Sequence, residues 1–293
     1  MLIAYENKRF NTASQLIIAK ANEIISEYDK QGFTLTLRQL YYQFVARDII
    51  ENTMKSYKRL GSIINDARMA GHISWYAIED RTRNLMSTPS WPTPADIMES
   101  VIYQYKEDTW DSQPYRPEVW IEKEALVGVI SRVCREYRVP YFACRGYNSQ
   151  SEQWGAGRRM LNHLENGQTP IVFHLGDHDP SGIDMTRDNL DRLAIFAEQG
   201  VEIRRLALNW DQVQKYNPPP NPAKSTDSRY DGYVQEFGEE SWELDSLEPR
   251  LIVQLVADAI LSVREDDPWE KAILKEEEGR EKLRDAQWRM KND

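Results

Sequence analysis

The sequence predicts a mixed α/β protein in two parts, a helical first part and a second part with a mainly parallel sheet flanked by helices. Before residue 88, apolar residues recur at helical spacing in three segments. The segment 86–94, MSTPSWPTP, then holds three prolines, which forbid a continuous helix. From Arg116 onward, short apolar runs alternate with helical segments, as in a parallel sheet. We therefore expect domains at 1–88 and 116–262, a linker at 89–115 and a charged C-terminal helix at 263–293.

The first domain is predicted to be a winged helix-turn-helix. Its helices are expected over 13–28, after a Thr36 cap, and from a Thr53 cap to Gly71. The alternating stretch 72–83, HISWYAIEDRTR, favours a short hairpin or wing, and the third helix of such a unit usually enters the DNA major groove. The candidate phosphate contacts on this helix and wing are Lys55, Lys58, Arg59, Arg68, Arg81 and Arg83. A solvated helical face explains the same charges equally well.

The second domain shows a pattern of strands and helices that predicts right-handed βαβ units. The strands are expected at 118–121, 141–143, 170–175 and 202–208, and the helices between them at 125–137, 151–166 and 183–199. Such crossovers place the helices on the faces of the sheet and leave the carboxyl ends of the strands open as a functional edge.

Three acids are predicted at that edge. Glu122 follows the first strand, and Asp177 and Asp179 follow the third, in IVFHLGDHDPSG. Carboxylate oxygens suit Mg²⁺, a hard cation that prefers oxygen ligands. Alternation along an extended backbone aims both aspartates to one side and His178 to the other. Simple solvation of a loop is the ordinary alternative for an isolated Asp-x-Asp pair, and a zinc site at His174 and His178 is disfavoured because they do not share a helical face.

The same residues carry a family resemblance. A strand-end Glu followed by DxDPxG resembles the Toprim domains of topoisomerase VI A subunits and of the related meiotic double-strand-break transesterases, and 241–247, SWELDSL, looks like the end of such a domain. TLRQLYYQF is similar to that family's Arg-x-x-aromatic-Tyr motif. The resemblance spans about 34–260. It implies Tyr42 as the nucleophile, Arg38 as its assistant, and Mg²⁺ held by Glu122, Asp177 and Asp179.

The spacing of the two motif residues is chemically usable. Arg38 and Tyr42 are four residues apart on one helix and therefore share a face, where a guanidinium can hold a phosphate or stabilise a phenolate. A phenol with a pKa near 10 needs such help to ionise at neutral pH. Tyr41 is expected to be the core member of the tyrosine pair, because neighbouring residues on a helix face different ways.

The resemblance also implies partners and a reaction. It implies a homodimer on double-stranded DNA, in which each site combines the tyrosine of one protomer with the metal of the other and leaves a 5′-phosphotyrosyl double-strand break. The chain has no Gly-rich ATP-binding segment, so strand passage would require a separate ATPase subunit of the topoisomerase VI B type. Two alternatives remain open: a Toprim nuclease that activates water, and a DNA-binding protein without catalysis.

Weaker candidates lie near the same edge. Glu124 and Lys123 are expected as auxiliary site residues, and Arg145 as a DNA contact. The net charge of −10 is unevenly distributed, because residues 1–88 hold 12 Lys and Arg against 9 Asp and Glu. The first domain is thus the part suited to a phosphate backbone. Without a long apolar run or a signal-peptide pattern, we expect a cytoplasmic protein with no membrane partner, and Cys134 and Cys144 as reduced, buried thiols.

Overall fold

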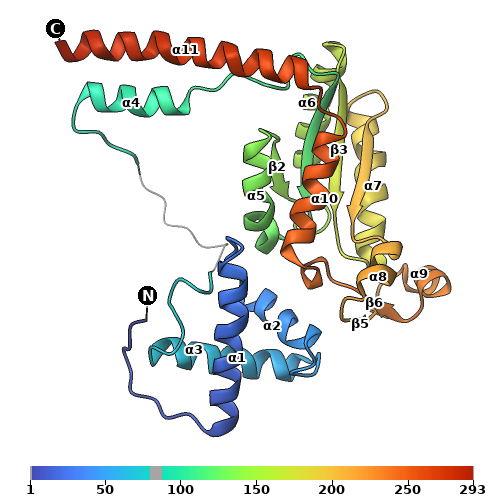
Figure 1. Ribbon diagram of the computed structural model, residues 1–293. Helices are drawn as coiled ribbons and strands as arrows, with labels where there is room; N and C mark the ends of the chain where they lie inside the picture. The colour runs from blue at the N-terminus through green and yellow to red at the C-terminus, as the bar shows by residue number, and fades with distance from the viewer. Residues whose placement is uncertain (1, 80–87, 293) are drawn as a thin grey trace.

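Residues 2–79 form a compact group of helices (Figure 1). In this computed structural model, which describes residues 2–79 and 88–292, helices α1 (Thr12–Asp29), α2 (Leu37–Ala46) and α3 (Met54–Met69) pack around one apolar core. Thr36 and Thr53 cap α2 and α3 as predicted, each accepting a hydrogen bond from the backbone N–H three residues on. Gly71 has a φ of 75° just past the end of α3, a backbone conformation that favours glycine.

The expected wing does not form in the described part of 72–83. Residues 72–79 make turns and one isolated bridge, in which Ile78 pairs in parallel with Leu35 ahead of α2. Ile73 and Ile78 are instead buried in the helical core, because the turns between them bring both side chains against the helices. The first domain is therefore a three-helix unit in the described residues, and the winged form of it is not confirmed.

The second part contains the predicted parallel sheet. Its strands are β1 (Tyr115–Ile121), β2 (Tyr141–Ala143), β3 (Thr169–Leu175) and β4 (Glu202–Ala207), in the order β2-β1-β3-β4 with every pairing parallel. The connections are η1 (Glu124–Leu126) with α5 (Val127–Glu136), then α6 (Gln150–Glu165), then α7 (Pro180–Phe196). These elements agree with the predicted segments to within a few residues at each end.

Alternating side chains bury both faces of this sheet. Val119 and Ile121 of β1 pack with α5 and with α10 (Pro249–Leu261), whereas Trp120 points to the other face and packs with α6 and α7. The helices after β1 and after β3 therefore lie on opposite faces. The chain leaves β1 toward β2 on one side of the sheet and leaves β3 toward β4 on the other side, so the two connections run in opposite directions. The carboxyl ends of two such neighbouring strands form the crevice where parallel sheets usually bind ligands.

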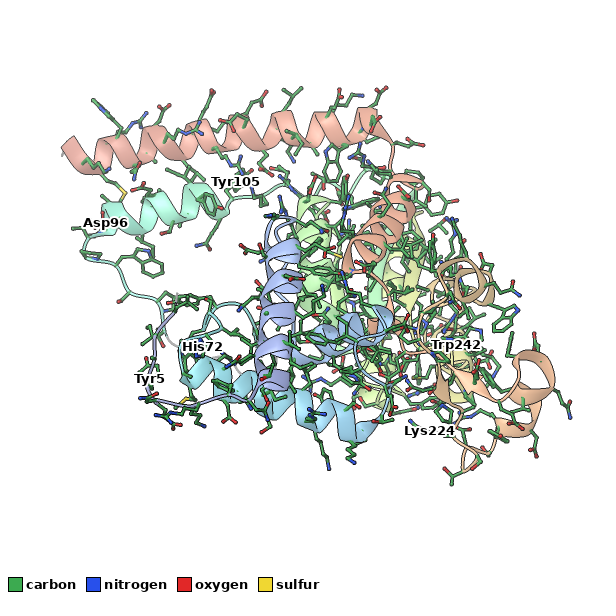
Figure 2. All side chains as sticks on the ribbon, turned by 60° about the horizontal axis from the view of Figure 1, so that its bottom comes forward. Tyr5, His72, Asp96, Tyr105, Lys224 and Trp242 are labelled. Atoms are coloured by element: carbon green, nitrogen blue, oxygen red, sulfur yellow. The ribbon has the colours of Figure 1, made fainter. Side chains whose placement is uncertain are left out.

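The region expected as a linker contains ordered structure. Within 89–115, α4 (Pro94–Gln104) lies along the long terminal helix α11 (Asp266–Asn292), and Figure 2 shows Tyr105 where the two approach. Further on, Trp110 is almost completely buried against the second domain and donates a hydrogen bond from Nε1 to the Tyr137 carbonyl at 2.7 Å. The second domain thus begins before Arg116, and α11 is covered by α4 on one side rather than fully solvated.

The segment after β4 connects the two domains. It holds α8 (Trp210–Tyr216), the antiparallel pair β5 (Asn221–Pro222) and β6 (Glu240–Ser241), α9 (Tyr230–Phe237) and η2 (Leu244–Ser246). The Asn52 amide of the first domain donates hydrogen bonds to the Pro220 carbonyl at 2.6 Å and to Asn221 Oδ1 at 3.0 Å, and Tyr28 donates one to Glu248. These contacts bring α2 against η2. No helix in the described ranges has the length and apolar character needed to cross a bilayer.

Candidate functional site

Two of the three predicted acids meet at the crevice between β1 and β3. The register pairs Ile121 with Leu175, so the residues that follow each strand leave the sheet side by side. The carboxylate of Glu122 accepts a hydrogen bond from the backbone N–H of Asp177 at 2.8 Å. The sequence placed these acids correctly because parallel strands in register end at the same edge.

Asp177 is the most buried of the three. Its Oδ1 accepts a hydrogen bond from the Leu244 backbone N–H at 2.7 Å and lies 3.2 Å from the Lys123 ammonium. Burial raises the pKa of Asp177 to about 7; Lys123 opposes that rise, and the negative charge of Glu122 adds to it. Burial also raises the pKa of Glu122. Ionising these two buried carboxylates therefore costs free energy.

Asp179 has a local structural role as well. It is the N-cap of α7, and its Oδ1 accepts hydrogen bonds from the Gly182 backbone N–H at 2.6 Å and from the Ser181 hydroxyl at 2.9 Å. A Cβ atom at Gly182 would lie 2.2 Å from the Asp177 carbonyl oxygen, so this tight turn requires glycine. One carboxylate oxygen of Asp179 is thus committed to the helix cap.

His178 points away from the acids, as the alternation predicted. Its ring lies within 6 Å, centroid to centroid, of four aromatic rings, those of Trp210, Tyr233, Phe237 and Trp242. Its backbone exchanges two hydrogen bonds with Trp242, at 2.8 and 2.9 Å, and Figure 2 shows Trp242 among the side chains next to α9. Burial lowers the pKa of His178 to about 4, so it is neutral. His178 therefore joins the Asp-x-Asp turn to the segment 240–245.

That segment brings two acids that the sequence analysis did not single out. Lys123 Nζ lies 2.6 Å from Glu243 Oε2, 2.9 Å from Asp245 Oδ1 and 3.2 Å from Asp177 Oδ1. Lys123, expected as an auxiliary residue, is thus the central cation of the cluster. The available signal was the Glu-x-Asp spacing inside SWELDSL, the same alternation that marked Asp177 and Asp179.

Arg205 was also missed. Its guanidinium donates hydrogen bonds to the carbonyl oxygens of Asp177 at 2.6 Å and Gly182 at 2.8 Å, and to the Thr186 hydroxyl at 2.7 Å. Burial lowers its pKa to about 10, although the nearby acids act in the opposite direction. Arg205 therefore holds the turn that bears Asp177 and Asp179 through its backbone carbonyl groups. Nothing in the sequence distinguishes it from its neighbour Arg204.

Arg38 and Tyr42 approach this cluster from the first domain. Both lie on α2 and share a face, with Arg38 Nη2 3.4 Å from the Tyr42 hydroxyl oxygen. The same guanidinium forms an ion pair with Glu243, and its Nε lies 3.2 Å from Asp245 Oδ2. Tyr42 and Glu243 are thus neighbours through their common contact with Arg38. A polar network therefore runs from the phenol through Arg38, Glu243 and Lys123 to Asp177.

Burial alone does not distinguish Tyr42 from Tyr41, because both side chains are nearly inaccessible. The hydrogen-bond partners of the two hydroxyl groups do distinguish them. The Tyr41 hydroxyl is bonded within the first domain, to Asn52 Oδ1 at 2.9 Å and to the Thr53 carbonyl at 3.2 Å. The Tyr42 hydroxyl instead faces the acids of the second domain. The Tyr41 hydroxyl is therefore held within the first domain, but the expectation that only Tyr41 of the pair belongs to the core is wrong, because Tyr42 is buried as well.

The charges around Tyr42 keep it protonated. Burial raises the pKa of its phenol, the carboxylates of Asp245 and Glu243 add to that rise, and Arg38 offsets only part of it. Burial alone would raise the pKa of Glu243, but Lys123 and Arg38 lower it to about 2. Ionising Tyr42 therefore requires more positive charge near its oxygen than this arrangement provides.

A small cavity opens beside the phenol. It has a volume of about 240 Å³ and lies between α2, the start of α3 and β5. Its lining includes both tyrosines together with Arg38, Asn52, Tyr57 and Glu243. Tyr42 and Glu243 of one chain share this cavity, whereas the family resemblance implies a tyrosine contributed by a second protomer.

The predicted phosphate contacts fall into three groups. Lys55, Lys58 and Arg59 are exposed on α3 and form no ion pair with any described residue. Arg68 lies over the Trp75 ring at 4.7 Å and donates to the Trp75 carbonyl, and Arg145 forms an ion pair with Glu124, so these cations are engaged within the protein. Arg81 and Arg83 lie outside the described residues.

The candidate ligands are carboxylate oxygens, the type of ligand that Mg²⁺ prefers. Within 2–79 and 88–292, no three His, Cys, Asp or Glu side chains are grouped closely enough to hold a metal ion. All of the candidate ligands are nevertheless carboxylates, and burial raises the pKa values of Glu122, Asp177 and Asp245. The residues are thus of the chemical type that Mg²⁺ prefers, but the described part of the chain does not bring three of them together as ligands.

Comparison with known proteins identifies no relative. No protein-family model matches this chain, and no curated protein is significantly similar to it.

Proposed function

We propose that this protein cleaves DNA by transesterification, with Tyr42 as the nucleophile and Mg²⁺ held by Glu122, Asp177 and Asp179. The observation that carries the proposal is the network in which the Tyr42 hydroxyl contacts Arg38, Arg38 pairs with Glu243, and Lys123 joins Glu243 to Asp177. A phenol, cations and a group of acids on one surface are the parts that phosphodiester exchange requires.

In the proposed reaction, the Tyr42 oxygen attacks the phosphorus of a DNA phosphodiester. The new bond is phenol oxygen to phosphorus, and the bond that breaks is phosphorus to the 3′ oxygen. The phenol proton passes to solvent or to a neighbouring carboxylate, and the departing 3′ oxygen takes up a proton. The product is a 5′-phosphotyrosyl end, whose phosphodiester energy is retained so that the step can reverse.

Arg38 and Lys123 supply the positive charge for this step. The Arg38 guanidinium already touches the Tyr42 oxygen and is held there by Glu243 and Asp245. A phosphate that replaced one of these acids would keep the guanidinium paired and would bring phosphorus to the phenol. Mg²⁺, when bound, supplies further positive charge close to the phosphate.

The proposed substrate is double-stranded DNA, bound by the exposed cations of α3. Lys55, Lys58 and Arg59 are without acidic partners in the described part of the chain, so they are available to a phosphate backbone. Two copies of the chain would be needed to cut both strands, and the proposal therefore includes a homodimer. Coupling to strand passage would need a separate ATPase subunit.

The test is plasmid cleavage with protein trapping. Supercoiled plasmid is incubated with the protein and Mg²⁺, stopped with denaturant, and analysed with and without protease. The proposal predicts linear DNA that carries covalently bound protein, and no such product from Tyr42→Phe. Tyr41→Phe is the matched control and is expected to retain the adduct. An adduct that persists in Tyr42→Phe would reject Tyr42 as the nucleophile.

One observation favours a second candidate, a metal-dependent hydrolytic nuclease. Tyr42 is only 3% exposed, and burial raises the pKa of its phenol, so it must be uncovered before it can attack. A water molecule would need no such movement. This alternative predicts cleaved DNA with protein-free ends and nearly unchanged cleavage by Tyr42→Phe. If Asp177→Asn and Asp179→Asn left every DNA-directed activity unchanged, a non-catalytic DNA-binding role would stand instead.

A further inference from the structure

A second cavity lies at the opposite end of the sheet from the acids. It has a volume of about 740 Å³ and is bounded by α6 and by the starts of β1 and β2. Because Arg116, Pro117 and Glu118 begin β1 whereas Glu122 follows its end, the length of the strand separates this groove from the candidate site. Its residues play no part in the proposed cleavage.

The groove is rich in guanidinium groups. Arg116, Arg158 and Arg159 line it together with His163, and Glu118 is the single acid among its lining residues. This excess of positive charge is unusual in a chain whose net charge is −10. The groove is therefore complementary to an anion.

Arg158 and Arg159 keep N–H donors free for a ligand, whereas Arg116 is paired with Asp108 at 2.5 Å. Arg159 uses Nε and Nη2 to bind Glu118, both at 3.1 Å, and its Nη1 remains near Gly155 on the groove wall. Arg158 uses only Nη1, in an ion pair with the exposed Glu198 at 3.1 Å. An arginine carries five N–H donors, and a half-exposed ion pair contributes little, so an anion can bind without breaking a strong interaction.

Aromatic rings form the rest of the surface. Trp154 is 57% exposed on α6, one helical turn before Arg158, and no hydrogen bond holds its indole to another described residue. Tyr141 and Phe142 of the edge strand β2 line the groove as well, and the Phe142 ring packs on Trp120 with centroids 4.8 Å apart. The groove thus offers a flat, exposed ring next to cations.

We propose that this groove binds a nucleotide, with the base stacked on Trp154 and the phosphate held by Arg158 and its neighbouring arginines. Exposed aromatic rings interleaved with arginine are the usual surface for unpaired nucleotides, because every base has a stacking face and every phosphate a negative charge. An acidic protein segment would satisfy the arginines but would leave Trp154 without a flat partner. The nucleotide could belong to a single DNA strand or be free in solution. The proposal does not depend on Tyr42 chemistry.

The experiment measures binding to two probes. Fluorescein-labelled single-stranded oligothymidine of ten nucleotides represents the strand, and adenosine 5′-monophosphate represents the free nucleotide. The full chain carries Tyr42→Phe, and EDTA is present, so that cleavage cannot affect the result. Trp154→Ala and Arg158→Gln are expected to weaken binding by about tenfold each. The matched controls are Tyr103→Ala, an exposed aromatic on α4, and Arg187→Gln, an exposed arginine on α7; neither lines the groove, and neither should change the affinity.

The outcomes separate the two sources. Oligothymidine binding that weakens in both groove variants, without binding of the monophosphate, supports a strand site; binding of the monophosphate with the same variant pattern supports a free nucleotide. The proposal is overturned if neither probe binds, or if the groove variants bind as tightly as the controls. Both altered groove residues are about half exposed, and a circular dichroism spectrum checks that each variant is folded.

Discussion

Two clusters of buried acidic groups in this protein are balanced in different ways. On α11, Glu276 is about 1% exposed and is surrounded by the cations Lys106, Arg138 and Arg280, with a fourth hydrogen bond from the Glu107 backbone N–H at 2.9 Å. Burial alone would raise the pKa of Glu276, but Arg138 and the other donors lower it. In this cluster one acid is fully paired.

The crevice at the carboxyl ends of β1 and β3 differs because acids outnumber cations there. Lys123 is shared among Asp177, Glu243 and Asp245, Arg38 pairs with two of these acids, and burial raises the pKa values of Asp177 and Asp245. A fully paired buried acid holds a structure together, whereas unbalanced acids in a crevice are typical of sites that bind or react with something. This contrast, rather than burial itself, marks the crevice as the candidate site.

The largest expected effect comes from neutralising an acid of the crevice. Asp177→Asn is expected to reduce plasmid cleavage below detection, because it removes a proposed metal ligand. The free energy of unfolding should not decrease by more than about 1 kcal/mol, since the lost charge was poorly balanced and the amide oxygen can still accept from Leu244. Cleavage assays and urea denaturation measure the two effects. Strong destabilisation would mean that this cluster is structural, like that of Glu276.

The second largest effect on cleavage is expected from removing the cation next to the phenol. Arg38→Gln removes the positive charge that touches the Tyr42 oxygen and leaves Glu243 and Asp245 facing it. We expect cleavage to fall by about 10²-fold, the usual cost of losing one donor that stabilises developing charge. Single-turnover cleavage rates measure this loss. Arg47→Gln, at the end of the same helix and away from the acids, is the control, and equal rates for both variants would contradict the role of Arg38.

On α11, neutralising the buried acid is expected to cost stability. Glu276→Gln breaks a buried ion pair and leaves Arg138 and Arg280 without their common partner. Such losses cost about 3–5 kcal/mol, which should loosen α11 and α4. Thermal unfolding and limited proteolysis in this region detect the change. Glu277→Gln is the matched control, because Glu277 is exposed and should tolerate the change. A stable Glu276→Gln variant would remove the contrast between the clusters.

A smaller effect is expected when the stability of the fold is measured against pH in the presence of EDTA. The folded-state pKa of Asp177 is about 7, above the roughly 3.9 of an unfolded aspartate, so the folded chain binds this proton more tightly. The cost of ionising Asp177 is absent below about pH 4 and complete above about pH 7, and stability should fall across that window. Asp177→Asn should flatten this part of the stability curve. A wild-type curve and a variant curve of the same slope would show that Asp177 does not titrate there.

The smallest expected effect lies on the surface of the first domain. Lys58→Gln removes one exposed, unpaired cation from α3. DNA affinity should weaken severalfold, and the slope of log affinity against log salt should decrease by about 0.9. Fluorescence anisotropy over a range of salt concentrations measures both quantities. Lys20→Gln on α1, where Lys20 is paired with Glu23, serves as the control; an unchanged slope in Lys58→Gln would place the DNA elsewhere.

Local patterns in the sequence were sufficient for much of the fold. The Thr36 and Thr53 caps, the helical periods and the four parallel strands depend on residues a few positions apart, and the structure confirms them. The meeting of Glu122 and Asp177 was also predictable, because it follows from strand register. The wing and the linker were not, since Ile73, Ile78 and Trp110 are buried through contacts with distant elements.

The composition of the candidate site was decided by tertiary structure. The sequence by itself determined that Arg38 and Tyr42 share a helix face and that acids follow β1 and β3. Only the fold joined Arg38 to Glu243, 205 residues away, gave Lys123 three acids to neutralise, and set the Tyr42 hydroxyl rather than that of Tyr41 against them. Backbone periodicity acts within a few residues, whereas the partner of a buried charge depends on how whole domains pack.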